Sequence, residues 1–255
     1  MSSFRDCSFK QLVTSIKKLG FYDVVETAYG ADLVAKLEAK ELLERGKITT
    51  SCCPSFVSYI KKAMPEYSNL ISSTLSPMAT LAEFIKSQDS AAKVVFIGPC
   101  TSKKYEIKTK HVGGRVDLTL TFEELDAMFA AKEIEPATQE ETEFNFVASK
   151  SGRGFASAGG VLAALTEEVA KIDPNFEVKA MNVSGIINFK QAIMKFASSD
   201  EFNVLEGMAC EGGCVAGPGV IVNPNIAIAQ LNKYVADGNQ NMVDGHPEKC
   251  SVLEQ

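Results

Sequence analysis

Hydrophobic residues recur along this chain with two different spacings. Repeats of three and four residues, which place apolar side chains on one face of a helix, predict a series of amphipathic helices. Short continuous apolar runs bounded by turn-forming residues are typical of strands that are buried on both faces of a parallel sheet. The helices are predicted at 9–18, 31–45, from 56 onward, 122–131, 159–171, 187–197 and 224–235, and the strands at 94–97, 176–183 and 203–208.

This alternation of helices and strands is the pattern of an α/β fold. Gly20 and Gly46 follow the first two helices, at a position where glycine commonly ends a helix. No internal repeat, low-complexity tract or proline-rich linker interrupts the sequence, so we expect one domain over 1–255 with a polar tail at 236–255. Ligands bind at the carboxyl ends of strands in open α/β sheets, which makes the loops after the strands the expected place of a site.

The composition excludes several classes of protein. Of the 255 residues, 45% are hydrophobic and 23% are charged, a balance typical of globular proteins and not of disordered, collagenous or coiled-coil ones. The net charge of −6 opposes nucleic-acid binding, because neutralising phosphates requires a basic surface. No apolar run reaches the roughly 18 residues that cross a bilayer, and the first residues lack a secretory apolar stretch. We therefore expect a cytoplasmic protein without a membrane span.

Lysine and histidine add little to this picture. Four lysines gather in one short stretch, at Lys103, Lys104, Lys108 and Lys110. They are interpreted either as a solvated face or as a docking patch for an acidic partner. With two histidines in the whole chain, catalytic triads and metal sites that need several histidines are poorly supplied.

Cysteine carries most of the chemistry in this sequence. The chain has seven cysteines, an odd number that fits a disulfide framework badly, and the cytoplasm keeps thiols reduced. Most of them lie in segments rich in glycine, proline and small residues, which favours metal ligation or catalysis. Cys7 and Cys250 stand apart near the ends of the chain and are interpreted as incidental free thiols.

Three segments contain the other cysteines. They are Thr-Ser-Cys-Cys-Pro at 50–54, Pro-Cys-Thr-Ser-Lys-Lys-Tyr-Glu at 99–106 and Glu-Gly-Met-Ala-Cys-Glu-Gly-Gly-Cys at 206–214. A cubane iron–sulfur cluster needs four cysteine thiolates. Because adjacent Cys52 and Cys53 cannot easily both face one metal site, one of them is the expected ligand and the other a free thiol nearby. The three loops can therefore supply four ligands. The paired C-x-x-C spacings of zinc ribbons and bacterial ferredoxins are absent, which makes zinc the weaker alternative.

The three segments resemble the signature motifs of the FeFe hydrogenases, written TSCCP, PCxxKxxE and ExMACxxGC. All three are present in the family's order, and the similarity extends from about residue 9 to about residue 223. The resemblance implies a two-lobed α/β catalytic domain with short, mostly parallel sheets flanked by helices and a cluster between the lobes. It also implies an enzyme of anaerobic metabolism that reversibly interconverts protons and electrons with H2.

The cofactor that this resemblance implies is the H-cluster, a 4Fe-4S cubane bridged to a di-iron unit with carbonyl, cyanide and azadithiolate ligands. The cubane would be held by Cys53, Cys100, Cys210 and Cys214. The sulfur of Cys214 would bridge to the di-iron unit, Cys52 would relay protons to the bridge amine, and the Lys103 ammonium would donate to a cyanide. The other positions placed beside the cofactor are Met208, Phe155, Pro99 and Glu106, of which Met208 and Phe155 are also explained as ordinary core residues.

The resemblance further implies a series of proton carriers that leads to solvent. Its members would be, in order, Cys52, Glu38, Ser72, Glu41 and Arg45. Independently of the family, Glu38, Glu41 and Arg45 fall at positions i, i+3 and i+7 of the predicted helix 31–45, so they share one face, where side chains can transfer protons or pair charges. Such a helix face is more commonly just solvated.

Two other functions are compatible with these motifs. An H2-sensing protein and an iron–sulfur assembly factor without the di-iron unit share part of them, but intact Cys52, Lys103 and Met208 favour catalysis. The sequence lacks the C-x-x-C-x-x-C runs of ferredoxin-like modules, so a ferredoxin-like partner is expected to exchange electrons and maturation enzymes to build the di-iron unit. The small Ala-Pro segment that lines the pocket in relatives is missing ahead of residue 9. Either the enzyme is minimal, or a further subunit or segment completes this wall, or the sequence is truncated.

Overall fold

The computed structural model describes residues 4 and 7–238, so most of the expected polar tail and Cys250 lie outside the described residues. Its strands are β1 (Ile48–Thr49), β2 (Val95–Ile97), β3 (Leu118–Leu120), β4 (Ala180–Ser184) and β5 (Val204–Met208). Its α-helices are α1 (Phe9–Lys18), α2 (Thr27–Arg45), α3 (Pro54–Ala63), α4 (Pro77–Gln88), α5 (Lys103–Glu106), α6 (Phe122–Ala131), α7 (Lys150–Gly154), α8 (Gly160–Ile172), α9 (Phe189–Ser198) and α10 (Pro224–Ala236). Short 3₁₀ turns are η1 (Pro65–Leu70), η2 (Pro136–Thr138), η3 (Ile186–Asn188) and η4 (Cys214–Ala216).

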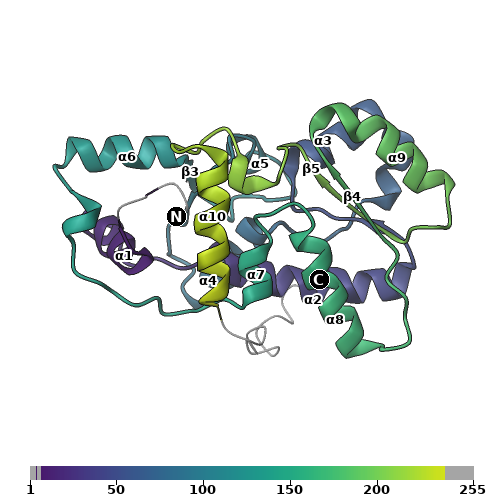
Figure 1. Cartoon of the computed structure of the whole chain (residues 1–255), viewed down its shortest axis with the longest axis horizontal. Helices are drawn as coiled ribbons and strands as arrows, with labels where there is room; N and C mark the ends of the chain where they lie inside the picture. The colour runs from purple at the N-terminus through teal and green to yellow at the C-terminus, as the bar shows by residue number, and fades with distance from the viewer. Residues whose placement is uncertain (1–3, 5–6, 239–255) are drawn as a thin grey trace.

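Two short parallel sheets flanked by helices organise the chain, which confirms the predicted α/β class. One sheet has the order β1-β5-β4, and the other consists of β2 and β3. Val204 of β5 lies opposite both Ile48 and Ala180, and Val95 of β2 lies opposite Leu118. Figure 1 shows an elongated molecule with α1 and α6 at one end, β4, β5, α3 and α9 at the other, and α10 crossing between them. No helix in the described part of the chain is long and apolar enough to cross a membrane.

Two helices have the bounds that the sequence predicts, and both begin with a reciprocal cap. In α1 the Ser8 hydroxyl accepts from the Gln11 backbone N–H while the Gln11 side chain accepts from Ser8 N–H. Thr121 and Glu124 form the same capping box at the start of α6. Such caps satisfy amides that have no partner inside the helix, so local sequence alone determines where these helices begin.

Other predicted elements have different bounds. Helix α2 begins at Thr27 and not at residue 31, although its first turns contain Gly30, a poor helix former. A Cβ at Gly30 would lie 2.3 Å from the Pro77 carbonyl oxygen, so this glycine lets α2 and α4 approach closely. The strand predicted at 176–183 is shorter because pairing with β5 begins at Ala180, and α9 begins at Phe189, after a 3₁₀ turn.

Helix α4 was not predicted from the pattern. All residues from Met78 to Ala82 are buried, so its first half has no polar face that would produce a helical stripe. The start does carry a local signal, because Ser76 is the N-cap residue and Pro77 is the first helical residue. Strands β1 and β3 are too short for a periodic pattern.

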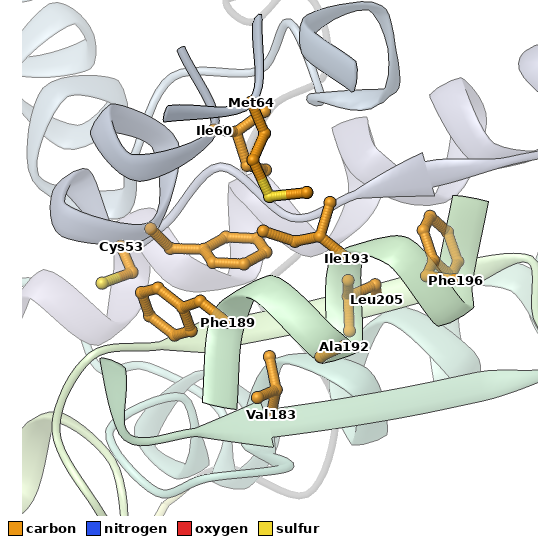
Figure 2. Close-up of a cluster of buried hydrophobic side chains, with 10 residues drawn as sticks. Cys53, Ile60, Met64, Val183, Phe189, Ala192, Ile193, Phe196 and Leu205 are labelled. Carbon is orange, nitrogen blue, oxygen red and sulfur yellow. The ribbon is translucent and has the colours of Figure 1, made fainter. Parts of the chain in front are cut away.

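A buried hydrophobic cluster joins α3 and α9 to the β4–β5 sheet. Figure 2 shows Cys53 and Phe189 at one end of this cluster, with the Cys53 sulfur directed away from its other members. The ring of Phe56, another member of the cluster, packs edge-on against Phe189 with 4.9 Å between ring centroids. Gly207 of β5 lies directly under Phe56, and a Cβ there would be 2.3 Å from the ring. Close packing of α3 on β5 thus fixes two cysteine-bearing segments relative to each other.

Candidate metal centre

The five motif cysteines lie at the carboxyl ends of parallel strands. Cys52 and Cys53 follow β1, and Cys53 is the N-cap residue of α3. Cys100 follows β2, while Cys210 and Cys214 follow β5. Both sheets therefore contribute to the site, as expected for ligands gathered at strand ends.

Four of these thiols are close enough to affect one another's ionisation. Burial, followed by the charges of Cys53 and Cys100, raises the pKa of the Cys214 thiol. Burial, followed by Cys100 and Cys53, raises the pKa of Cys210 to about 11. The pKa of Cys53 is raised as well, chiefly by burial. The structure therefore brings Cys53, Cys100, Cys210 and Cys214 together, and all six described cysteines are free of disulfides.

This donor set fits an iron–sulfur cubane. Thiolates crowded in a buried place are unfavourable unless cations stand between them, and metal ions supply that charge and deprotonate the thiols. A cubane takes four cysteine thiolates, and these four can supply them while Cys52 lies beside them. Within the described ranges, no group of three or more His, Cys, Asp or Glu is arranged to hold a single metal ion.

Lys103 lies beside these cysteines and is buried, with a side chain 9% exposed. Its ammonium is 2.6 Å from a Glu106 carboxylate oxygen and donates to the backbone carbonyl of Cys52 at 3.2 Å. Burial by itself lowers the pKa of Lys103, but Glu106 outweighs it, so the net pKa is raised and the side chain is cationic. The interpretation of the lysines as one solvated face or docking patch is therefore wrong for Lys103, whereas Lys108 and Lys110 are exposed.

A cavity of about 690 Å³ extends to the cysteines from the side of α1 and α4. Met208 and Phe155 are buried at its inner end and pack with Cys52 and Cys214 in one hydrophobic cluster. The residues from the three motifs and from the Phe155 loop that line this end are Cys52, Pro99, Lys103, Phe155, Met208 and Cys214. The expected cofactor-binding positions thus surround one mostly apolar space, and Glu106 joins them through its ion pair with Lys103.

The outer half of the expected proton path is continuous. The Ser72 hydroxyl donates to Glu41 Oε2 at 2.6 Å, and the Ser73 backbone N–H donates to Glu41 Oε1 at 2.9 Å. Arg45 forms an ion pair with Glu41 and also donates to the Ile71 carbonyl oxygen. Burial by itself raises the pKa of Glu41, but hydrogen bonds from Ser72, Ser73 and Arg45 outweigh burial and hold this pKa below its ordinary value. Helix α2 therefore carries this end of the path from the interior to a partly exposed guanidinium.

The inner half contains a gap in direct hydrogen bonding. Glu38 is fully buried, and its Oε1 accepts from the Ser51 N–H at 2.9 Å and the Ser51 hydroxyl at 3.1 Å. Its Oε2 has no hydrogen-bond partner among the described residues. Burial raises the pKa of Glu38 to about 7, and the charge of Glu38 adds to burial in raising the pKa of Cys52. The Cys52 sulfur itself lies 4.0 Å from the Thr50 hydroxyl.

Sequence reasoning assigned no role to Glu206, although it begins the third motif. Its buried carboxylate accepts from the backbone N–H groups of Gly159 and Leu162, at the start of α8, and from the Asn182 side chain. Burial raises the pKa of Glu206 despite these bonds. This carboxylate ties β5 to the loop that carries Phe155, and its motif position was the signal that could have identified it.

A buried ion pair at the cavity wall was also missed. Arg153 donates through Nε to Glu26 at 2.9 Å and through Nη1 to the backbone carbonyl of Tyr234 at 2.8 Å. The Tyr234 hydroxyl hydrogen-bonds Glu26, and its ring lies under the Arg153 guanidinium. These contacts join the start of α2, α7 and α10, which lie far apart in sequence, so no local motif signals them.

Comparison with known proteins identifies the class. The family described as "Iron only hydrogenase large subunit, C-terminal domain" matches residues 1–218. Iron hydrogenase 1 of Clostridium pasteurianum is 28% identical over 271 residues, which cover 88% of this chain and 47% of that protein. The periplasmic Fe hydrogenase large subunit of Nitratidesulfovibrio vulgaris is 28% identical over 85% of this chain and 63% of its own length. The cytosolic Fe-S cluster assembly factor NAR1 of Encephalitozoon cuniculi is 23% identical over 79% of this chain and 60% of its own length.

Solved structures share the fold. The structure of the FeFe-hydrogenase HydA(deltaEFG) superposes on this protein with a TM-score of 0.75 and 22% sequence identity. The match covers 98% of this chain and 83% of the HydA chain. An apo FeFe-hydrogenase HydA1 variant from Chlamydomonas reinhardtii gives the same TM-score and identity. The family match covers most of the chain, so this protein belongs to the iron-only hydrogenase large subunit, C-terminal domain family. The chain spans about half to two thirds of the length of these three curated relatives.

Proposed function

We propose that this chain is an FeFe hydrogenase catalytic domain that reversibly interconverts protons and electrons with H2. The observation that carries the proposal is the convergence of Cys52, Lys103, Met208 and Phe155 with the candidate ligand Cys214 around one end of a single cavity. A site that only bound a cubane would need four thiols and no apolar space next to them. The family membership supports the same chemistry. We treat 1–255 as one domain of two interwoven lobes.

The residues present fit an H-cluster. Four thiols would hold its cubane, namely Cys53, Cys100, Cys210 and Cys214. When bound, the cluster would supply redox-active iron with an open position for hydrogen chemistry. The cationic ammonium of Lys103 would donate to an anionic ligand of the di-iron unit, and Glu106 keeps that ammonium charged and in place. Met208 and Phe155 would exclude water from this part of the cavity.

The chain's own residues would move protons between the cavity and solvent. The Cys52 thiol faces the cavity, and Glu38 stands behind it with a pKa of about 7, close to the value that suits a proton carrier at neutral pH. The unpartnered Oε2 of Glu38 is free to form a transient bond. Ser72 would connect Glu38 to Glu41, and Arg45 would end the path at the surface.

Electrons would come from or go to a separate ferredoxin-like protein. Maturation enzymes would build the di-iron unit, as the resemblance to FeFe hydrogenases implies. We place the protein in the cytoplasm, a compartment in which cysteine thiols stay reduced.

Two other functions are the alternatives. Similarity to a cytosolic Fe-S cluster assembly factor favours a role in which a cubane is bound without turnover. An H2 sensor would keep the cofactor and respond to H2 with little turnover.

Anaerobic expression with hydrogenase maturation enzymes, followed by an assay of H2 release from reduced methyl viologen, separates these functions. The proposal predicts sustained H2 release that is abolished in Cys53→Ser. A protein that retains cubane absorption but releases no H2 would favour the assembly factor. H2-dependent spectral changes with only trace turnover would favour the sensor.

A further inference from the structure

Two serine hydroxyls bond to each other between the segments that carry Cys53 and Cys100. The Ser55 hydroxyl oxygen lies 2.5 Å from that of Ser102, and either of the two can be the donor. Each serine stands two residues after a candidate ligand, Ser55 after Cys53 and Ser102 after Cys100. Both serines are half-buried. This serine pair therefore connects two of the loops that meet at the candidate metal centre.

The two connected loops come from different sheets. Cys53 follows β1 of the three-stranded sheet, and Cys100 follows β2 of the two-stranded sheet. In the described structure, no backbone–backbone hydrogen bond joins the segment 50–56 to the segment 99–106. Strand pairing therefore does not fix Cys53 and Cys100 relative to each other, and side-chain contacts between the two segments have to do so.

Helices α3 and α5 meet along a seam, and the serine pair lies at the end of that seam next to the cysteines. Ser55 and Lys62 are seven residues apart and share one face of α3, while Ser102 and Tyr105 are three residues apart and share one face of α5. The Lys62 ammonium lies 5.0 Å from the centre of the Tyr105 ring. Because Lys62 and Tyr105 are both exposed, this cation–π contact forms the outer end of the seam.

The serine pair has one hydrogen to spare. Ser102 is the N-cap residue of α5, but its side chain forms no capping bond to that helix. Neither Ser55 nor Ser102 forms another side-chain hydrogen bond to a described residue. Two hydroxyls carry two hydrogens, and the bond between them uses one. The second hydrogen therefore has no acceptor among the described residues.

A ligand thiolate is the acceptor that suits this hydrogen once a cluster is bound. Metal ligation deprotonates cysteine thiols, so the candidate ligands beside the serines would carry negative charge. Burial raises the pKa of the Cys53 thiol, and the backbone N–H groups of Ala209 and Phe56 oppose part of that rise. Donors around Cys53 thus already favour charge on its sulfur. A hydroxyl donor strengthens this effect, because hydrogen bonds to ionised acceptors are the stronger ones.

We propose that Ser55 and Ser102 are positioning residues for the cubane: their mutual bond holds the Cys100 loop against the start of α3, and their spare hydrogen donates to the sulfur of a candidate ligand. This inference rests on the proposed function only in requiring that the four thiols hold a cubane. Hydrogen bonds to the sulfurs help to set the reduction potential of an iron–sulfur cluster. They stabilise the reduced cluster, which carries one more negative charge, so the serine pair raises the potential.

The reduction potential of the cubane measures this effect without the di-iron unit. The full chain is expressed without maturation enzymes, loaded anaerobically with iron and sulfide, and titrated with reductant while electron paramagnetic resonance follows the reduced cluster. In Ser55→Ala and in Ser102→Ala we expect the potential to fall by about 59 mV, which corresponds to a tenfold smaller equilibrium constant for one-electron reduction. The double variant is expected to fall no further, because each single change already breaks the pair.

Thr101→Ala is the matched control. Thr101 is adjacent to Cys100, but it is exposed and lies outside the serine pair. Its replacement removes a hydroxyl from the same loop and leaves the bond between Ser55 and Ser102 in place, so the potential should keep its wild-type value. An equal fall in Thr101→Ala would show that any change in this loop lowers the potential, and it would overturn the role of the serine pair.

Conservative variants separate the hydroxyl group from packing. Ser55→Thr and Ser102→Thr keep a hydroxyl that both donates and accepts. The wild-type potential is therefore expected in at least one of them. A fall in both threonine variants that equals the fall in the alanine variants would assign the shift to packing and overturn the proposal. All variants are compared at equal cubane content, so that incomplete loading does not enter the comparison.

Failure of this inference and failure of the proposed function give different results. Wild-type potentials in Ser55→Ala and Ser102→Ala, or falls that add in the double variant, would overturn the role of the serine pair and leave the hydrogenase proposal intact. A wild-type chain that takes up no cubane would overturn the four-cysteine ligand set and both proposals with it. A potential that follows the hydroxyl pair supports this inference whether or not the chain turns over H2.

Discussion

Replacing Glu38 with glutamine is expected to stabilise the protein at neutral pH while removing most of its turnover. Glu38 is fully buried, and it is held through one oxygen by the Ser51 N–H and hydroxyl. Burial raises its pKa from 4.5 to about 7. Glutamine keeps a carbonyl oxygen that can accept from Ser51, but it carries no charge at any pH.

The magnitude follows from the pKa difference between the folded and unfolded states. A raised folded-state pKa means that the unfolded chain ionises first as pH rises. The wild type therefore loses stability between pH 4.5 and about pH 7 and loses no more above it. At about 1.4 kcal/mol per pH unit, this interval corresponds to about 3 kcal/mol. Glu38→Gln removes this loss, so the free energy of unfolding of the variant rises relative to that of the wild type over this pH range.

Urea unfolding from pH 4 to pH 8, under anaerobic conditions and in one state of cluster loading, measures the effect. The difference in unfolding free energy is expected to move by about 3 kcal/mol in favour of Glu38→Gln between pH 4.5 and pH 7. Glu44→Gln, an exposed change on the same helix, should show no such trend. Turnover should fall at least 100-fold, because a proton carrier is lost. Parallel stability profiles for wild type and Glu38→Gln would refute the assignment of an ionisable, buried Glu38.

Three other substitutions test the candidate site and its support. Cys52→Ala spares the four candidate ligands, so iron content should be unchanged and turnover about 100-fold lower; equal turnover would mean that protons take another route. Cys214→Ala should lose iron and cluster absorption, and a normally loaded variant would contradict the ligand assignment. Arg153→Met leaves Glu26 buried without its cation, so urea unfolding should show a loss of about 3–5 kcal/mol; a loss below about 1 kcal/mol would show that the pair does not hold α2 and α7 together.

The site could be predicted from sequence where chemistry is concentrated in short motifs. The position of Cys100 after a strand follows from the apolar run 94–97, and that of Cys53 just ahead of a helix follows from the helical stretch predicted from residue 56 onward; the structure brings the two cysteines together. The burial of Lys103 could not be read from its neighbours, since Lys104, Lys108 and Lys110 follow it with similar local composition. Only the packing of α5 beside the cysteine loops distinguishes Lys103 from the other three lysines.

Long-range polar pairs and very short strands could not be predicted from local sequence patterns. Glu26 and Arg153 are 127 residues apart, and neither stands in a recognisable motif. β1 has two residues and β3 has three, fewer than any periodicity needs. By contrast, α1 and α6 were predicted with correct bounds because capping boxes act within four residues.

An infrared spectrum of the chain, matured anaerobically or loaded with a synthetic di-iron precursor, tests the central claim most directly. If Cys53, Cys100, Cys210 and Cys214 hold an H-cluster beside the Lys103 pocket, sharp carbonyl and cyanide bands will appear and shift under H2. Iron–sulfur absorption without those bands would contradict the proposed hydrogenase site and leave a cubane-binding protein.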